Sequence, residues 1–146
     1  LVRTHRWFRN GARVNLAHPT DEINRKYGRP FMKRGIFSNT VRDGRMLEIV
    51  QEMLPGITHL CLNRDVTCAP HRDAKNTGEY SYVLFFGEFE GGELCLETGE
   101  CFSEHEVWHR FRGQSVTHWN LPHTGRKYSI VAYSRSSRVK ADVCSK

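Results

Sequence analysis

The apolar positions of the chain change their spacing at about residue 56. Just before this point, the stretch DGRMLEIVQEMLPG at 43–56 carries apolar side chains at the three- and four-residue spacing of an amphipathic helix. These side chains are Met46, Leu47, Ile49, Val50, Met53 and Leu54. Asp43 is a suitable N-cap, and Pro55-Gly56 ends the pattern. We therefore expect one helix here, preceded by an irregular section over residues 1–42 that prolines and glycines interrupt.

After Gly56 the pattern becomes short apolar runs separated by turns. The runs are THLCLN (58–63), YSYVLFF (80–86), GGELCLE (91–97), EVWHRF (106–111), SVTHWN (115–120) and YSIVAYS (128–134). Short strands at this spacing are typical of a sandwich or barrel. We predict one domain over residues 1–146 that is mainly β with a flanking helix. Residues 1–56 form its N-terminal section and helix, and residues 57–137 form its β core.

The positive charge is concentrated in the N-terminal third. Residues 1–45 hold eleven Lys or Arg against three acids, a net charge of +8, whereas the whole chain carries +6, so the remaining residues carry −2. A basic segment suits DNA or another nucleic acid, and a solvated surface is an equal alternative. No apolar run approaches the roughly 20 residues that a membrane helix needs, so no membrane partner is expected.

The cysteine pattern predicts a reducing intracellular compartment, with nucleus and cytoplasm both open. The five cysteines are odd in number and none are spaced C-x-x-C, which argues against a disulfide framework or a zinc knuckle. We expect most of them to behave as small apolar side chains in strands.

A candidate metal site begins at His71 and Asp73, which stand two residues apart in CAPHRDAKN. In extended chain both side chains leave the same face, so they can chelate one ion. An imidazole with a carboxylate suits a divalent transition metal, and a second histidine would complete a 2-His-1-carboxylate triad. The candidates are His105, His109, His118 and His123. His118 stands out because a turn and a strand with two cations, Arg126 and Lys127, follow it.

This arrangement resembles the Fe(II)/2-oxoglutarate-dependent dioxygenases over roughly residues 58–134. The shared features are the H-x-D, the distal histidine, the cation in RKYSI and the stretch GEFEGGEL, all in the family's order. The resemblance implies a double-stranded β-helix, also called a jelly roll, with a cupin-like core. It implies that His71, Asp73 and His118 are catalytic ligands of Fe(II), and that 2-oxoglutarate and O2 are co-substrates in C–H hydroxylation.

The residue that would bind 2-oxoglutarate departs from the usual family pattern. The register of the distal histidine gives Lys127 where the family usually has arginine, and Arg126 stands beside it. Only one of the two can point inward from a strand. The register favours Lys127 and the residue type favours Arg126. Asn63 and Ser129 are further candidates for contacts with the keto-acid, and a related acid or ascorbate is an alternative.

For the substrate, HRDAKN is similar to the H-x-D-x-x-N of the ten-eleven-translocation methylcytosine oxygenases, which are related to the base-J thymine hydroxylases. This similarity implies that Asn76 contacts a flipped-out, methylated pyrimidine base in DNA, since an amide can both donate to and accept from its edge. A turn role for Asn76 is the alternative.

Two other functions stay open. Prolyl hydroxylases share the His/Asp/His order and a last strand close to KYSI, so a peptidyl or small-molecule hydroxylase is one alternative. A non-catalytic, basic jelly-roll binding module is the other.

Overall fold

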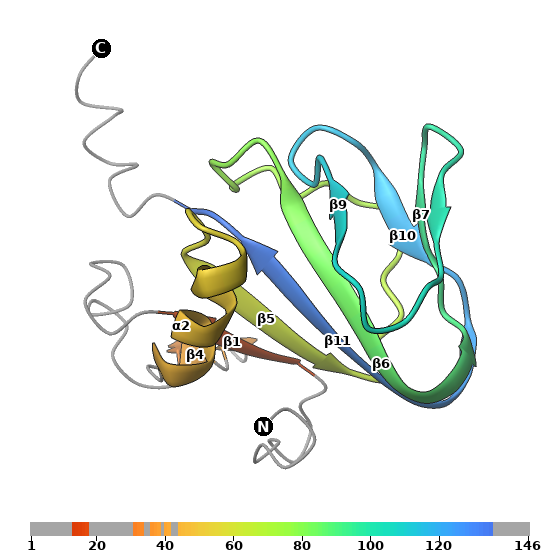
Figure 1. Ribbon diagram of the computed structural model, residues 1–146, viewed down its shortest axis with the longest axis horizontal. Helices are drawn as coiled ribbons and strands as arrows, with labels where there is room; N and C mark the ends of the chain where they lie inside the picture. Colours follow the sequence, from red (N-terminus) through yellow and green to blue (C-terminus); the bar gives the residue numbers. More distant parts are fainter. Residues whose placement is uncertain (1–12, 18–30, 34–35, 39, 42–43, 136–146) are drawn as a thin grey trace.

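The computed structural model describes residues 13–17, 31–33, 36–38, 40–41 and 44–135 (Figure 1). Its helix is α2 (Gly44–Met53). The strands are β1 (Arg13–Ala17), β2 (Phe31–Lys33), β3 (Ile36–Ser38), β4 (Thr40–Val41), β5 (His59–Arg64), β6 (Ser81–Gly91), β7 (Leu94–Leu96), β8 (Cys101–Phe102), β9 (His109–Phe111), β10 (His118–Asn120) and β11 (His123–Tyr133). None of the described helices is long and apolar enough to cross a membrane.

The strands form two facing sheets and a small separate pair. The larger sheet has the order β4-β1-β5-β11-β6-β9, the smaller has β10-β7-β8, and β2 pairs with β3. All pairings are antiparallel except that of β1 with β4. Figure 1 shows the long strands β5, β11 and β6 side by side, with β7 and β10 opposite them.

The connectivity is that of a jelly roll. An antiparallel bridge between His71 and His118 adds a short segment to the smaller sheet, next to β10. Counted along the chain, the eight segments of the core are β5, the His71 segment, β6, β7, β8, β9, β10 and β11. In this numbering the larger sheet has the order 1-8-3-6 and the smaller sheet has the order 2-7-4-5. The chain thus crosses between sheets as a double-sheet jelly roll does. The predicted double-stranded β-helix with a flanking helix is confirmed.

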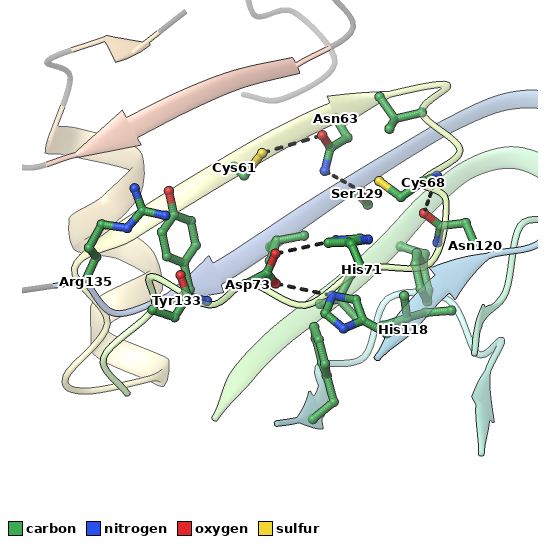
Figure 2. A pocket seen from close by; sticks show the side chains of 17 residues that line it. Cys61, Asn63, Cys68, His71, Asp73, His118, Asn120, Ser129, Tyr133 and Arg135 are labelled. Atoms are coloured by element: carbon green, nitrogen blue, oxygen red, sulfur yellow. Dashed lines mark hydrogen bonds and ion pairs between the residues drawn. The ribbon is translucent and has the colours of Figure 1, made fainter. Parts of the chain in front are cut away.

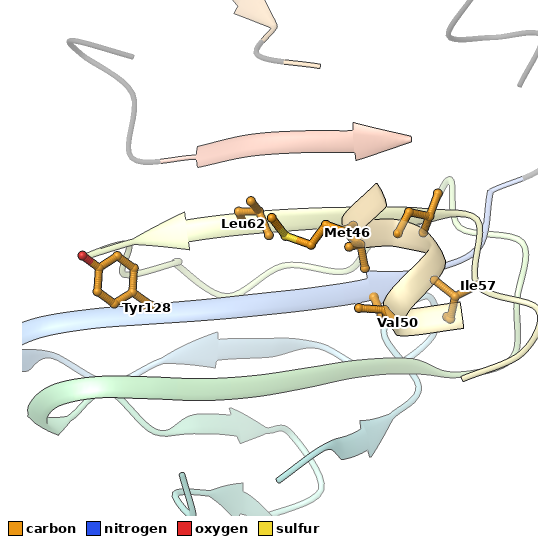
Figure 3. Close-up of a cluster of buried hydrophobic side chains, with 8 residues drawn as sticks. Met46, Val50, Ile57, Leu62 and Tyr128 are labelled. Atoms are coloured by element: carbon orange, nitrogen blue, oxygen red, sulfur yellow. The ribbon is translucent and has the colours of Figure 1, made fainter. Parts of the chain in front are cut away.

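The larger sheet separates two apolar clusters. On its outer face, Met46, Leu47 and Val50 of α2 pack with Ile57, Leu60, Leu62, Tyr128 and Ala132 (Figure 3). Between the sheets lie Val83, Phe85, Leu94, Leu96 and Phe111. Because side chains alternate along a strand, β5 and β11 send one set of residues under the helix and the other set toward the space between the sheets.

Several sequence-based expectations need correction. Strands β1 to β4 lie within the section expected to be irregular, and β1 pairs with β5 along its whole length. The final strand begins at His123, within the turn expected between His118 and Arg126, since β11 continues its ladder with β6 through Gly125 at φ 90°. Two of the expected helix core residues, Ile49 and Met53, are exposed because α2 rests on the sheet through a narrower stripe. The expected N-cap, Asp43, lies outside the described residues.

Two cysteines depart from the expectation that most of the five behave as small apolar side chains. Cys95 and Cys101 form a disulfide. They stand directly opposite each other in the β7–β8 pairing, where antiparallel neighbours come close together. The two-residue strand β8 has no apolar run of its own, so the pairing was not visible in the sequence. The predicted compartment remains a prediction.

Candidate metal centre

His71, Asp73 and His118 meet at one end of the space between the sheets. Two backbone hydrogen bonds join His71 and His118, with N···O distances of 3.0 and 2.9 Å. The amide of Asp73 donates to the carbonyl oxygen of Gly113 at 2.8 Å. Main-chain hydrogen bonds therefore fix the backbone of all three residues independently of their side chains.

The three side chains point their ligand atoms at one another (Figure 2). His71 Nε2 lies 3.5 Å from Asp73 Oδ1, and His118 Nε2 lies 3.2 Å from Asp73 Oδ2. Nitrogen and oxygen atoms of all three fall within 4.8 Å of one another. In the part of the chain that the structure describes, this is the cluster of His, Cys, Asp or Glu whose spacing suits a metal ion.

Backbone carbonyls set the tautomer of both imidazoles. His71 Nδ1 lies 2.7 Å from the carbonyl oxygen of Ala69, and His118 Nδ1 lies 2.8 Å from that of Val116. Because a carbonyl can only accept, each Nδ1 must carry the proton. In the neutral rings the Nε2 lone pairs then face the Asp73 carboxylate and are repelled by it. A cation bound between them removes this repulsion. This is the usual arrangement of histidines that bind metals.

The electrostatics of the site also favour a positive charge. Burial lowers the pKa of His118, but the hydrogen bond to Asp73, the bond to the Val116 carbonyl and the charge of Asp73 together raise it above its ordinary value. The Asp73 carboxylate thus attracts a proton to its neighbour, as it would attract a metal cation.

This donor set fits Fe(II). Two neutral imidazoles and one carboxylate supply three ligands and leave positions for other molecules, as in the facial triad of non-haem iron oxygenases. His118 is buried, whereas His71 and Asp73 are partly exposed to the pocket. The pocket has a volume of about 200 Å³, so small molecules can reach the ligands.

The pocket extends in two directions from the triad. In Figure 2, Cys68 and Asn120 lie on one side, near Asn63 and Ser129, and Tyr133 and Arg135 lie on the other. Apolar side chains complete the wall; they are Val66, Val83, Phe85, Leu94, Phe111 and Val131.

The two cations considered for 2-oxoglutarate lie on opposite faces of β11. Lys127 is 3% exposed, on the same side of the strand as the pocket residues Ser129 and Val131. Its Nζ donates to the carbonyl oxygen of Gly92 at 2.8 Å and lies 5.2 Å from the centre of the Phe85 ring. Lys127 does not itself line the pocket, but Phe85 does. Burial lowers the pKa of Lys127, although Cys68, Glu93 and Asp65 oppose this shift.

Arg126 instead points outward to Asp65. Its Nε lies 2.8 Å from Asp65 Oδ2, and its side chain is 54% exposed. Asp65 also accepts a 2.7 Å hydrogen bond from the Lys127 amide and lies 3.4 Å from His123 Nε2. Asp65 therefore anchors the start of β11 and fixes which of the two cations faces inward.

Asn63, Ser129 and Asn76 are buried and line the pocket. Asn63 Nδ2 donates to Ser129 Oγ at 3.2 Å, so these two candidates form one polar patch beside the triad. Asn76 Nδ2 donates to Ser81 Oγ at 3.3 Å, and the backbone N–H of Asn76 donates to the Asp73 carbonyl oxygen at 3.0 Å. Asn76 thus has structural partners, while its predicted contact with a substrate stays a prediction.

The remaining histidine candidates lie away from the triad. His109 Nε2 lies 2.8 Å from the Glu104 carbonyl oxygen, and His105 stacks on Phe89 at 4.3 Å between ring centres. His123 pairs with Asp65. The cluster that the structure brings together therefore contains the histidine chosen from the sequence.

Sequence reasoning missed Asn120, Tyr133 and Arg135 in the pocket wall. Strand alternation was the available signal. Asn120 stands two residues after His118, and Tyr133 and Arg135 continue the inward series that starts with Lys127.

Comparisons with known proteins were made for sequence and for structure. No protein-family model and no curated protein sequence matches this chain. Among solved structures, it is similar to an oxidoreductase of the 2OG-Fe(II) oxygenase family from Burkholderia pseudomallei, with TM-score 0.47 and 21% identity over 66% of this chain and 56% of that one. A prolyl 4-hydroxylase from Phytophthora capsici gives TM-score 0.46 and 16% identity, over 66% of this chain and 41% of that one. The match thus spans less than two thirds of either protein, and at these values it assigns no activity.

Proposed function

We propose that this protein is a non-haem Fe(II)/2-oxoglutarate-dependent dioxygenase that hydroxylates a C–H bond. The observation that carries the proposal is the orientation of both imidazoles, whose Nε2 atoms face the Asp73 carboxylate while backbone carbonyls hold their Nδ1 protons. When bound, Fe(II) with 2-oxoglutarate and O2 would supply the oxidising power, and ascorbate is a further candidate reductant.

The chain's own residues would bind the co-substrate and shield it. Lys127 offers a buried positive charge for the distal carboxylate, and its low exposure makes that charge act in a medium of low dielectric constant. Asn63 and Ser129 offer hydrogen-bonded polar groups in the pocket wall. The apolar wall around Phe85 and Leu94 limits the access of water to the keto group.

Metal analysis of single variants tests this proposal. His71→Ala, Asp73→Ala and His118→Ala should each lose stoichiometric Fe(II), because each removes one of three ligands. His109→Ala is the matched control and should keep it, because His109 lies outside the cluster. Retention of iron by His118→Ala would move the third ligand elsewhere, with His123 the first alternative.

The substrate proposed from the sequence is a methylated pyrimidine base in DNA. Its support is the net charge of +8 over residues 1–45 and the presence of Asn76 in the pocket wall. The side chains of residues 1–45 lie outside the described part of the structure. A peptidyl or small-molecule substrate uses the same chemistry, and a binding module without turnover is the remaining alternative. Turnover of 2-oxoglutarate to succinate in the presence of each substrate class separates the three.

A further inference from the structure

Arg135 lies in the pocket wall with its charge uncompensated by any described carboxylate. The side chain is partly buried, and its Nε is buried without a hydrogen-bond partner in the structure. The guanidinium lies 5.7 Å from the centre of the Tyr133 ring. A buried guanidinium N–H without an acceptor is costly, which points to a ligand that supplies the missing acceptor.

The backbone under Arg135 is firmly held. Its amide donates to Thr58 Oγ1 at 2.9 Å, and the Thr58 amide donates to the Tyr133 carbonyl at 3.1 Å. Tyr133 also stacks on His59, with 5.2 Å between ring centres. Arg135 therefore stands on a fixed aromatic platform at the end of β11, which reduces the entropy lost when it binds a partner.

The position of Arg135 assigns it to the substrate and not to 2-oxoglutarate. Lys127 and Arg135 are eight residues apart, which is roughly 26 Å of extended chain at about 3.3 Å per residue. In Figure 2, Asn63 and Ser129 lie on one side of the triad and Arg135 lies on the other. A five-carbon keto-acid bound to the triad and Lys127 cannot also reach Arg135, so the Arg135 side remains open for the molecule to be hydroxylated.

We propose that Arg135 binds a carboxylate of the substrate, which would therefore be an organic acid, an amino acid or a peptide with an acidic group near the reacting carbon. This inference rests on the proposed function. A planar carboxylate can accept two parallel N–H bonds from a guanidinium. Arg135 is the single Lys or Arg among the described residues of the pocket wall, whereas a polynucleotide needs several phosphate contacts. This favours a carboxylate over DNA.

The test uses the whole protein loaded with Mn(II), a redox-inert substitute for Fe(II), and 2-oxoglutarate under anaerobic conditions. Paramagnetic broadening of ligand NMR signals reports binding close to the metal, and a Zn(II)-loaded sample provides the diamagnetic reference. The probes are N-acetyl amino acids with their neutral amides, short peptides with Asp or Glu matched to Asn or Gln, and a methylcytosine oligonucleotide. Single amino acids and peptides distinguish the two sources of carboxylate.

We expect at least one carboxylate probe to be broadened and its amide partner to be unaffected. Arg135→Gln should weaken that binding about tenfold or more, as expected for loss of a charge-assisted pair. Arg135→Lys should fall between, because it keeps the charge without the planar fork. Arg110→Gln, on the exposed side of β9, is the matched control and should bind as the wild type does.

Four results would overturn the inference. They are equal binding of acid and amide, unchanged binding in Arg135→Gln, broadening of the oligonucleotide alone, and no broadening of any probe. A fifth is that Arg135→Gln weakens 2-oxoglutarate binding whereas Lys127→Met leaves it unchanged. This result would make Arg135 the residue that binds the co-substrate. If 2-oxoglutarate itself is not broadened in the wild type, the proposed function fails as well, so the two failures are distinguishable.

Discussion

At the scale of single residues, Lys127 shows a conflict between stability and binding. The fold buries its ammonium with the Gly92 carbonyl as hydrogen-bond acceptor and the Phe85 ring nearby. No described carboxylate lies within ion-pair distance of it. Desolvation therefore opposes its charge, as the lowered pKa indicates. Such a residue is explained most simply by an anionic ligand that is bound next to it.

Replacement of Lys127 by Met should separate the two effects. The variant keeps the length of the side chain but removes the charge, so the concentration of 2-oxoglutarate needed for half-maximal turnover should rise tenfold or more. Arg126→Met should change it much less, because Arg126 faces Asp65 on the outside. The reverse ranking, measured by succinate formation, would show that the cation that binds the keto-acid was wrongly assigned.

The lowered pKa of Lys127 also predicts a pH dependence of stability. In the unfolded chain lysine keeps its proton to higher pH than in the fold, so the unfolded state binds more protons between the two pKa values. The cost of burying the charged Lys127 ammonium is fully present below the pKa of Lys127 in the folded state. It disappears as the pH rises toward the ordinary pKa of lysine. The free energy of unfolding of the wild type, relative to Lys127→Met, should therefore increase over this interval. Denaturant titrations at several pH values measure it, and a constant difference would contradict the argument.

At the scale of elements, the loop between β9 and β10 positions the proposed metal ligand Asp73, which lies in the loop between β5 and β6. The Gly113 carbonyl accepts the Asp73 amide hydrogen bond. A Cβ at Gly113 would lie 2.8 Å from Ser81 Oγ and 3.1 Å from Asp73 Oδ2. No space is left there for a methyl group without movement of the Asp73 carboxylate.

Gly113→Ala should therefore weaken metal binding although it removes no ligand. We expect a loss of about tenfold in affinity, in the range seen when outer contacts of metal ligands are changed. Leu47→Ala is the control, because Leu47 lies under α2 on the far face of the sheet. That control should lower the free energy of unfolding by about 2–5 kcal/mol and leave metal affinity unchanged. Equal metal affinity in Gly113→Ala and the wild type, by calorimetry, would show that the loop does not position Asp73.

At the scale of the whole molecule, the uneven charge gives a test of the nucleic-acid hypothesis. Residues 1–45 carry +8 and the rest −2. If the basic section binds a polyanion, the logarithm of affinity should fall steeply and linearly with the logarithm of salt concentration. Fluorescence anisotropy of a labelled oligonucleotide between low and physiological salt measures the slope. A flat response would exclude this mode of binding and favour the carboxylate substrate.

The sequence predicted a sandwich or barrel and the pairing of His71 with Asp73 because these signals are local, whereas the jelly roll and the choice of His118 depended on the resemblance to the dioxygenase family. The alternation of apolar residues marks strands, and the H-x-D spacing places two ligands on one face. The choice between Arg126 and Lys127 needed the register of β11, which Asp65 helps to fix from the bend just after β5. Arg135 was missed because it lies just past the expected strand end at residue 134, although alternation from Ser129 places it on the pocket side. The Cys95–Cys101 pair depends on contacts that no single segment reveals.

The most direct test of the central claim is an anaerobic spectroscopic titration of the whole protein. Fe(II) is added first and 2-oxoglutarate second, and the visible spectrum is recorded for the wild type and His71→Ala. We predict a metal-to-ligand charge-transfer band that needs both additions and is absent in His71→Ala. A wild-type protein that binds Fe(II) without forming the band would contradict 2-oxoglutarate as the co-substrate. Failure to bind iron would contradict the enzyme and leave a basic jelly-roll binding module.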